Sequence, residues 1–451
     1  MNKSIKAKGN ALARLNALFD ENTEIINSPS NADGLLWGEG KVNGKAVFAI
    51  SRDNSYKGGS LNMLQAEIIC DIIYRAEKCG APFLFIMESA GARVQDGIDG
   101  LEGYGRIFAA VSFASGRIPL IFIAMGVCAG GAAYTAALCD AVIMNTQNGR
   151  MFVTGPKVLK NATGETATDK ELGSAEVHSY HSGDVHFCEN GEEECISKAR
   201  QLLSYLPQSC GEMPQRSAEY TESNIAFDVP KDFKKPYDML SVINAVTDKD
   251  SFLPIQQDFA ANIITGFGRI KGMCIGIVAN QPNVLCGALD VDSSCKAARF
   301  ISFCDSFNIP IITLEDTPGF LPGKIQEQKG ILRHGAKLLA AYSAATVPKI
   351  TVIIRKAVGG AYIAMNSNGM GADKVFAWEN AKISVMDDQL SASFSKNEKT
   401  RSGGLEHALA TGAVSRVIKP CQTVEAIAES LKLLLEKYTP QSNKKHFNIP
   451  Q

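Results

Sequence analysis

Two stretches of the sequence, PLIFIAMGVCAGGAAYTAAL (residues 119–138) and KITVIIRKAVGGAYIAM (residues 349–365), share one pattern. Each begins with an apolar run of strand length, passes through two consecutive glycines and continues into small residues that favour a helix. Glycines at such a junction permit positive φ and leave the amides of the first helical turn unobstructed. The pattern therefore predicts a strand, a tight turn and a helix, twice in one chain.

The two stretches belong to a longer internal repeat. The matched positions, at an offset of 228 and then 229 residues, include Asn16/Asn244, Gly38/Gly266, Gly59/Gly287, Gly91/Gly319, Pro119/Pro348 and Gly130/Gly359. Chance matches among the 40 glycines would not keep one order over more than 100 residues. We therefore predict two similar domains, residues 1–225 and 226–451, with the boundary inside the polar, proline-containing segment 207–236.

Short apolar runs alternate with longer segments of helical period in both halves. The predicted strands are residues 45–51, 82–88, 119–125 and 141–145 in the first half and residues 273–280, 310–316, 349–355 and 374–378 in the second. Residues 61–80 and 293–308 are predicted helices, and the segments GEGKVNG (38–44) and GRIKG (268–272) are interpreted as turns. Fully apolar strands that alternate with helices predict an α/β fold with helix-covered sheets.

The glycine pairs allow two interpretations. They can be structural, because glycine lets a helix approach a sheet closely. They can also expose main-chain N–H groups at a helix N-terminus, which is the geometry of an oxyanion hole. The second interpretation is favoured by the repetition and by two glycine-containing loops, ESAGARVQDG (88–97) and EDTPGFLPGKIQEQKG (315–330), at the ends of predicted strands, where α/β domains bind ligands. Neither loop contains a phosphate-binding glycine motif.

The composition limits the class of partner. With 46 basic and 47 acidic residues the net charge is -1, which provides no electrostatic attraction to nucleic acid. The first residues, MNKSIKAKGNALARL, lack the apolar core of a signal peptide, and no apolar run is long enough to span a membrane. We therefore expect a cytoplasmic protein that does not bind nucleic acid.

The chain has twelve cysteines but no C-x-x-C pair, which favours buried, reduced thiols. Three of the six histidines lie in HSYHSGDVH (178–186), although their spacing matches no metal-ligand pattern. No metal is expected.

Several long stretches resemble the carboxyltransferase subunits of biotin-dependent acyl-CoA carboxylases and decarboxylases. They include SAGARVQDGIDGLEGYGRIFAAVSFASGRIPLIFIAMGVCAGGAAYTAAL, KKPYDMLSVI, DTPGFLPGKIQEQKGILRHGAKLLAAYSAATVPKITVIIRKAVGGAYIAM and GADKVFAWENAKISVM. Propionyl-CoA carboxylase beta subunits and methylmalonyl-CoA or glutaconyl-CoA decarboxylase subunits are the most similar in pattern. The resemblance implies two tandem crotonase-like (ClpP/crotonase) domains of ββα units, assembled into a hexamer built as a trimer of dimers. The segment SVMDDQLSASFSKNEKTRSGGLEHALATGAVSRVI (384–418) is shorter and more polar than in that family.

The resemblance also implies the site residues. Gly130 and Gly131 would hold the enolate oxygen of the acyl-CoA thioester, and Gly360 and Ala361 would hold the ureido oxygen of biotin. Ile363, two residues later, would line the acyl pocket or fill space in the core. Further residues expected beside acyl-CoA in the N-terminal domain are Ala90, Gly91, Ala92 and Ala129, and those expected beside biotin in the C-terminal domain are Gly319, Phe320, Val358 and Gly359.

The implied reaction uses biotin itself as the base: N1-carboxybiotin releases CO2, the biotin anion takes the α-proton, and the enolate captures CO2. The chain has no Met-Lys-Met biotinylation site and no ATP-grasp module, so a separate biotin carboxyl carrier protein and either a biotin carboxylase or a membrane decarboxylase subunit are the implied partners. Two alternatives stay open. One is a tandem crotonase-type hydratase or isomerase, which would need paired carboxylates such as Glu88 and Asp96, and the other is a non-catalytic scaffold that binds CoA thioesters.

Overall fold

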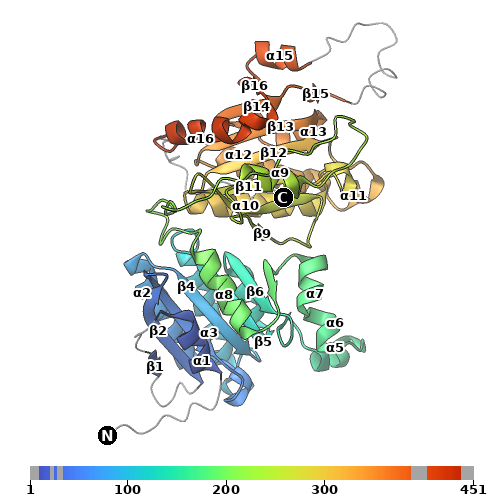
Figure 1. Cartoon of the computed structure of the whole chain (residues 1–451). Helices are drawn as coiled ribbons and strands as arrows, with labels where there is room; N and C mark the ends of the chain where they lie inside the picture. Colours follow the sequence, from blue (N-terminus) through green and yellow to red (C-terminus); the bar gives the residue numbers. More distant parts are fainter. Residues whose placement is uncertain (1–9, 21–24, 28–33, 387–403, 438–451) are drawn as a thin grey trace. The chain divides into compact units, whose positions relative to one another are not determined.

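The computed structural model describes residues 10–20, 25–27, 34–386 and 404–437, and the chain divides into two compact units, Met1–Met213 and Pro214–Gln451 (Figure 1). The predicted boundary at residue 225 therefore lies within the second unit. The difference arises because residues after 213 already hydrogen-bond to that unit. Arg216 Nε donates to Lys271 O at 3.1 Å, and the Ser217 N–H donates to Gly272 O at 2.9 Å. Much of the polar segment 384–418 lies outside the described residues.

The first unit is one mixed sheet covered by helices. Its strands are β1 (Ile25–Asn27), β2 (Leu35–Val42), β3 (Lys45–Arg52), β4 (Phe83–Ser89), β5 (Leu120–Ala129), β6 (Ala141–Asn145), β7 (Arg150–Phe152) and β8 (Phe187–Glu189). Its helices are α1 (Ala11–Leu18), α2 (Met63–Cys79), α3 (Ile98–Ala114), α4 (Gly131–Leu138), α5 (Pro156–Thr163), α6 (Asp169–Gly173), α7 (Ala175–Val177) and α8 (Glu192–Leu203), with short turns η1 (Lys57–Gly59), η2 (Val94–Asp96) and η3 (His178–Ser182). The strand order is β1-β2-β3-β4-β5-β6-β8, with β7 paired to β5, and the strands from β3 onward run parallel.

The second unit repeats this plan. Its strands are β9 (Leu253–Ile255), β10 (Ile263–Ile270), β11 (Met273–Asn280), β12 (Ile311–Thr317), β13 (Lys349–Val358), β14 (Lys374–Trp378), β15 (Lys382–Ser384) and β16 (Arg416–Ile418). Its helices are α9 (Met239–Val246), α10 (Val291–Ser306), α11 (Lys324–Gln328), α12 (Ile331–Ala344), α13 (Gly359–Ala364), α15 (Leu405–Ala410) and α16 (Thr423–Leu434), with turns η4 (Leu285–Gly287), η5 (Asn368–Met370) and η6 (Pro420–Gln422). The order β16-β14-β13-β12-β11-β10-β9, with β15 paired to β13, matches that of the first sheet.

The duplication is visible element by element. Strands β3 and β11, and β4 and β12, differ by the predicted offset of 228 residues, and β5 and β13 differ by 229. Every predicted strand and both predicted helices are found, and α2 ends as expected at Gly80, which adopts the left-handed conformation with φ 61°.

The two segments interpreted as turns are mostly strand. Residues 38–42 belong to β2 and residues 268–270 to β10, and only the two-residue connections after them, Asn43–Gly44 and Lys271–Gly272, turn the chain. All four of these residues have positive φ, as tight hairpins require. The strand glycines are explained by packing, since a Cβ at Gly38 would lie 2.8 Å from the ring of Phe19.

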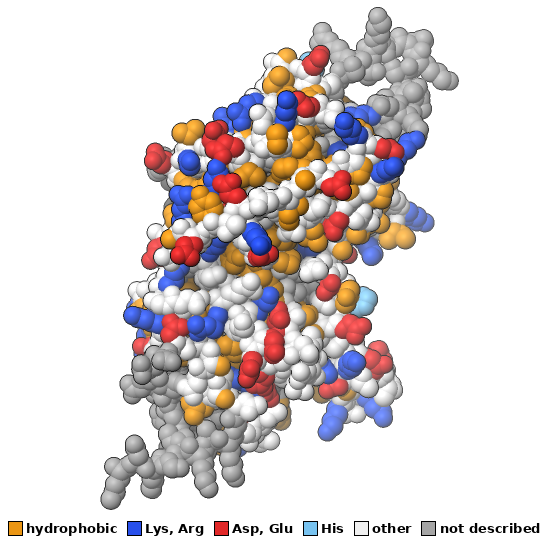
Figure 2. Space-filling model, viewed as in Figure 1, with side chains coloured by type: hydrophobic (Ala, Val, Ile, Leu, Met, Phe, Trp, Pro, Cys, Tyr) orange, Lys and Arg blue, Asp and Glu red, His pale blue; other side chains and the backbone are white. Residues whose placement is uncertain are grey.

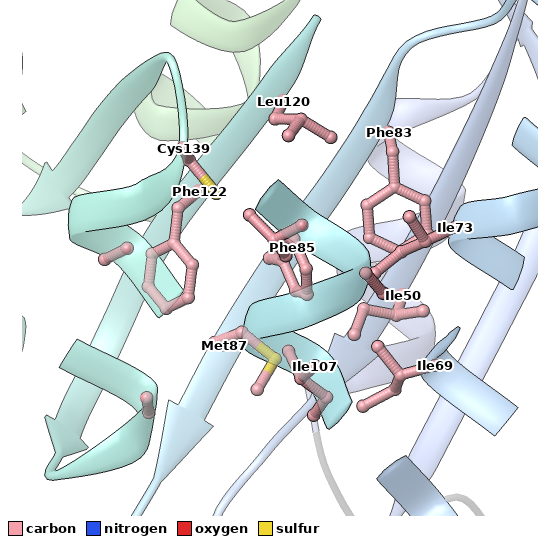
Figure 3. Close-up of a cluster of buried hydrophobic side chains, with 14 of the residues drawn as sticks. Ile50, Ile69, Ile73, Phe83, Phe85, Met87, Ile107, Leu120, Phe122 and Cys139 are labelled. Carbon is pink, nitrogen blue, oxygen red and sulfur yellow. The ribbon is translucent and has the colours of Figure 1, made fainter. Parts of the chain in front are cut away.

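The core of the first unit is a continuous apolar layer between the sheet and helices α2 and α3. Figure 3 shows part of it, with Phe83, Phe85 and Met87 of β4 facing Ile69 and Ile73 of α2. At the surface, acidic and basic side chains are interspersed on both units (Figure 2), which agrees with the balanced composition.

No disulfide joins the twelve cysteines, all of which lie in the described part of the chain. The prediction that they are buried is wrong for four of them, because exposed positions are found at Cys79, Cys210, Cys286 and Cys421. Among the described residues no helix has the length and hydropathy that crossing a lipid bilayer requires.

Candidate active site

The turn between β5 and α4 is formed by Gly130, whose φ of 57° and ψ of −118° are accessible to glycine but strained for other residues. Its N–H donates to Phe152 O on β7 at 3.0 Å. This amide therefore already has an acceptor in this structure, and the role of Gly130 as one of the two oxyanion donors stays a prediction. Gly130 forms the turn, and the amides without an intrahelical acceptor belong to the residues that follow it.

The first turn of α4 offers such amides. Its first intrahelical bond runs from Tyr134 N–H to Gly130 O, so the amides of Gly131 and Ala132 have no acceptor within the helix. A Cβ at Gly131 would lie 2.3 Å from Cγ of Tyr104, a buried residue on α3. Gly131 is thus required by the close packing of one aromatic ring beneath the turn.

The loop after β4 lies against this turn. Ser89 Oγ accepts the N–H of Gly91 at 3.2 Å and lies 3.1 Å from Tyr104 Oη, so the loop and the ring are held together. Gly91 has a φ of 93°, and a Cβ there would lie 3.1 Å from Ala129 O. Ala90 is tied to η1 by its N–H bond to Gly58 O at 3.0 Å. The substrate-side residues expected from the sequence are therefore gathered at one end of the sheet: Ala90, Gly91, Ala92, Ala129 and Gly131.

The second unit repeats the arrangement. Thr317 Oγ1 accepts the N–H of Gly319 at 3.3 Å, as Ser89 does for Gly91. Gly359 has a φ of 62° and occupies the turn position of Gly130, while Gly360 is exposed beside the ring of Phe320, whose nearest atom would lie 3.7 Å from a Cβ.

The remaining C-terminal residues of the predicted site differ in exposure. Ala361 and Val358 are buried, and Ile363 is 46% exposed on α13. Ile363 is thus accessible to a ligand, whereas Val358 contributes to the turn through its position at the end of β13.

The carboxylates that a hydratase would need are engaged elsewhere. Glu88 forms an ion pair with Arg14, a side chain that is only 2% exposed and that also donates from Nε to Glu192 Oε2 at 2.8 Å. Burial by itself lowers the pKa of Arg14, but the hydrogen bonds that Arg14 donates to these two carboxylates outweigh it and raise the pKa. Asp96 lies on η2, 3.9 Å from Arg93 Nη1. Glu88 is therefore not placed to act as an acid or base at the first turn.

The histidine-rich stretch has a structural role in the described residues. His178 Nε2 bonds to Met151 O at 2.8 Å, and Nδ1 lies 3.2 Å from Asp184 Oδ2. Burial alone would lower the pKa of His178, but Asp184 and the Met151 carbonyl raise it overall. His186 Nδ1 instead accepts the N–H of Val142 at 3.1 Å. No group of three potential metal-binding side chains is found in the part of the chain that is described.

Three residues of the site were not predicted from the sequence: Ser89, Thr317 and Tyr104. Ser89 and Thr317 occupy the same repeat position, so the self-alignment contained a signal for them. The sequence contained no such signal for Tyr104, because its contact with Gly131 depends on how α3 and α4 pack.

Two duplicated α/β units, each with a glycine turn that leads into a helix whose first-turn amides have no acceptor within that helix, define a tandem crotonase-like protein. Residues 13–449 match the family model described as the carboxyl transferase domain. The chain belongs to the carboxyl transferase family, which confirms the predicted family, fold class and carboxyltransferase function.

Similar proteins span nearly the whole chain. The carboxyltransferase subunit of propionyl-CoA carboxylase from Haloferax mediterranei is 45% identical, covering 93% of this chain and 86% of the relative. The alpha subunit of methylmalonyl-CoA decarboxylase from Veillonella parvula is 42% identical, covering 99% and 94%. A crystal structure of the transcarboxylase 12S hexamer with hydrolysed methylmalonyl-coenzyme A bound matches with a TM-score of 0.92 at 41% identity, covering 98% of this chain and 92% of that one.

Proposed function

We propose that this chain transfers a carboxyl group between biotin on a separate carrier protein and the α-carbon of a short acyl-CoA. The observation that carries the proposal is the repeated turn: each unit presents first-turn amides without an intrahelical acceptor beside a glycine-containing loop. The names of the similar proteins, and the methylmalonyl-coenzyme A bound in the transcarboxylase 12S crystal structure, support an acyl-CoA substrate.

In the first unit we assign the oxyanion donors to Gly131 and Ala132. Their amides would stabilise the enolate oxygen of the thioester, and loss of one such donor typically costs about 3 kcal/mol of transition-state stabilisation. The loop 90–92 and Ala129 would line the thioester. Because Glu88 is committed to Arg14, the chain does not supply this carboxylate as the base that removes the α-proton.

In the second unit, Gly360 and Ala361 would donate to the ureido oxygen of biotin. The site fits a small bicyclic ring, because Gly360 is exposed and the Phe320 ring beside it offers an apolar surface. When bound, biotin supplies a ureido group that carries the carboxyl and accepts the substrate proton. Gly319 and Gly359 shape the backbone around that ring through their positive φ values.

Ile363 is the residue to which we assign acyl-group selection. It is exposed on α13 and apolar, so it would contact a short alkyl group without offering a hydrogen bond. A change of one methylene in such a pocket alters discrimination by about 1–3 kcal/mol.

The proposed partners are a biotin carboxyl carrier protein and either a biotin carboxylase or a membrane decarboxylase subunit. By analogy with the transcarboxylase 12S hexamer, we also propose a hexamer of this chain, located in the cytoplasm.

The experiment is a biotin-dependent decarboxylation assay. The purified chain is incubated with malonyl-CoA or methylmalonyl-CoA, with and without free biotin, and CO2 release is measured. Gly360→Val, which introduces a branched side chain beside Phe320, should lower biotin-dependent turnover by roughly 10- to 1000-fold. Gly105→Ala is the matched control, because its Cβ would meet nothing within 4 Å. Hydration of crotonyl-CoA without biotin, and no CO2 release with it, would contradict the proposal.

A further inference from the structure

The buried face of the central strands differs in character between the two units. In the first unit, Phe85 and Met87 of β4 and Phe122 of β5 form an apolar layer (Figure 3). The equivalent positions in the second unit, at the offsets of 228 and 229 residues, are Thr313, Glu315 and Thr351. The same backbone scaffold therefore carries polar groups beneath α13 where the first unit carries hydrocarbon.

Glu315 is the most unusual of these residues. Its side chain is 0% exposed, and neither carboxyl oxygen has a hydrogen-bond partner among the described residues. Asn366, also 0% exposed, has an unpartnered Oδ1 in the same part of the chain. An unsatisfied buried polar atom costs roughly 1–3 kcal/mol, so two such groups in one core require a physical reason.

The sheet register and two hydrogen bonds place both groups beside Thr351. Thr313 pairs with Thr351, whose hydroxyl donates to Asn366 O at 2.8 Å and accepts from Asn366 Nδ2 at 3.1 Å. Glu315 lies two residues after Thr313 on the same face of β12, and diagonal neighbours of adjacent strands are about 7–8 Å apart. Glu315 and Asn366 are therefore both neighbours of Thr351.

The chemistry of the two groups is complementary when Glu315 is protonated. A neutral carboxyl has one O–H donor, and the amide oxygen of Asn366 needs one. Burial, with a smaller effect from the charge of Asp316, raises the pKa of Glu315 well above its usual range.

The other titratable groups nearby are already partnered or neutral. Asp316 points to the opposite face of β12 and accepts from Arg355 Nε at 2.7 Å, while Lys349 Nζ donates to Tyr342 O at 2.6 Å. Burial raises the pKa values of the three remaining groups on the surrounding helices: Tyr342 on α12, Tyr362 on α13 and Cys304 on α10. None of these five supplies a counter-ion for an ionised Glu315.

We propose that Glu315 is a positioning residue for the biotin half of the site: its carboxyl donates to Asn366 Oδ1 through one bound water, and so fastens the end of α13 to β12. Asn366 follows α13 in the left-handed conformation, with φ 67°, and is already bound to β13 through Thr351. With Glu315 attached, α13 is held from two strands, which fixes the amides of Gly360 and Ala361. The consequence for biotin rests on the proposed function, whereas the water-mediated link between the two side chains does not.

The link is tested by a double-mutant cycle on unfolding free energy, with Glu315→Met, the residue of the first unit, and Asn366→Gly, which tolerates positive φ. Loss of the water-mediated link makes each single variant less stable, and the double variant should be less destabilised than the sum of the two. Infrared spectra should also show the carbonyl stretch of a protonated carboxyl at neutral pH, which Glu315→Gln removes. Additive single effects, or no such band, would overturn the proposal even if the enzyme shows no turnover.

The role in positioning is tested by kinetics. Glu315→Gln keeps an N–H donor for Asn366 and should retain the KM for biotin, whereas Glu315→Met should raise that KM on the order of 10-fold and leave acyl-CoA affinity unchanged. Thr313→Val is the matched control, since it alters the same face of β12 but removes only the 2.8 Å contact with Tyr342. Wild-type activity should fall as pH rises through the raised pKa of Glu315, and Glu315→Gln should not show this fall. Equal impairment in the Gln and Met variants would refute the role.

Discussion

Alanine substitution should affect the stability of the two units differently, because Gly131 and Gly360 occupy matched positions in the repeat but have different surroundings. In Gly131→Ala the new Cβ would lie 2.3, 2.4 and 2.6 Å from three ring atoms of Tyr104, so the buried ring must move. The displacement would strain the 3.1 Å contact between Tyr104 Oη and Ser89 Oγ, and with it the loop held at Gly91. In Gly360→Ala the nearest atom is 3.7 Å away, which is an ordinary contact.

The expected magnitudes follow from these contacts. Overpacking costs about 1–3 kcal/mol, and a weakened hydrogen bond adds about 0.5–1.5 kcal/mol, so Gly131→Ala should lose roughly 2–4 kcal/mol. For a unit of this size that corresponds to a Tm lower by roughly 4–16 °C. Gly360→Ala should stay within about 0.5 kcal/mol of the wild type, because its side chain meets no crowded neighbour.

Tryptophan fluorescence provides the assay. The chain has 2 tryptophans, Trp37 on β2 and Trp378 on β14, so each unit carries its own reporter. Denaturant titrations in Trp37→Phe and Trp378→Phe backgrounds follow the second and first unit separately. The reasoning is refuted if both alanine variants shift their own unit equally, or if Gly131→Ala leaves the first unit unchanged.

Three further outcomes are expected. Arg14→Met leaves Glu88 and Glu192 without their shared cation and should destabilise the first unit by about 3 kcal/mol. Combining Arg14→Met with Glu88→Met should recover part of that stability. Calorimetry that shows no recovery would contradict the buried ion pair. The pKa of His178 is raised in the folded state, so its contribution to stability is fully present below the unfolded pKa and is lost as pH rises through the folded pKa. Asp184→Asn should flatten this loss of stability in melting curves recorded from pH 5 to 9. Ile363→Ala should shift kcat/KM toward longer acyl-CoA thioesters by roughly 10-fold, and an unchanged preference among acyl lengths would assign Ile363 to packing alone.

The sequence predicted the elements whose signals are local. The apolar runs at residues 141–145, 273–280 and 374–378 coincide with β6, β11 and β14, because a buried strand needs no information beyond its own residues. The glycine-bearing strands β2 and β10 were interpreted as turns, since their stability comes from hairpin partners and from rings such as Phe19 that pack on the glycines. Propensity alone does not report such tertiary contacts.

In the candidate site, too, local signals could be predicted from the sequence and tertiary contacts could not. The loop and turn residues were predicted because glycine spacing is visible in the repeat, but the acceptor of the Gly130 N–H is the carbonyl of Phe152 on a separate short strand. Likewise, Glu88 reads as a potential catalytic acid until Arg14, 74 residues away in sequence, is seen to pair with it. Such pairings depend on tertiary packing, which one sequence does not encode in any local pattern.

The aromatic rings that lie beneath the two turns have different origins. In the first unit Tyr104 of α3 packs against Gly131, whereas in the second the Phe320 ring beside Gly360 comes from the loop itself, at the repeat position of Ala92. The two copies thus place an aromatic ring beside the matched glycine from different elements. Exchanging the glycine loops between the two units would place two rings, or none, beside the glycine that follows. The two units are therefore no longer interchangeable, and recombination between them would require a compensating change on the helix that carries Tyr104.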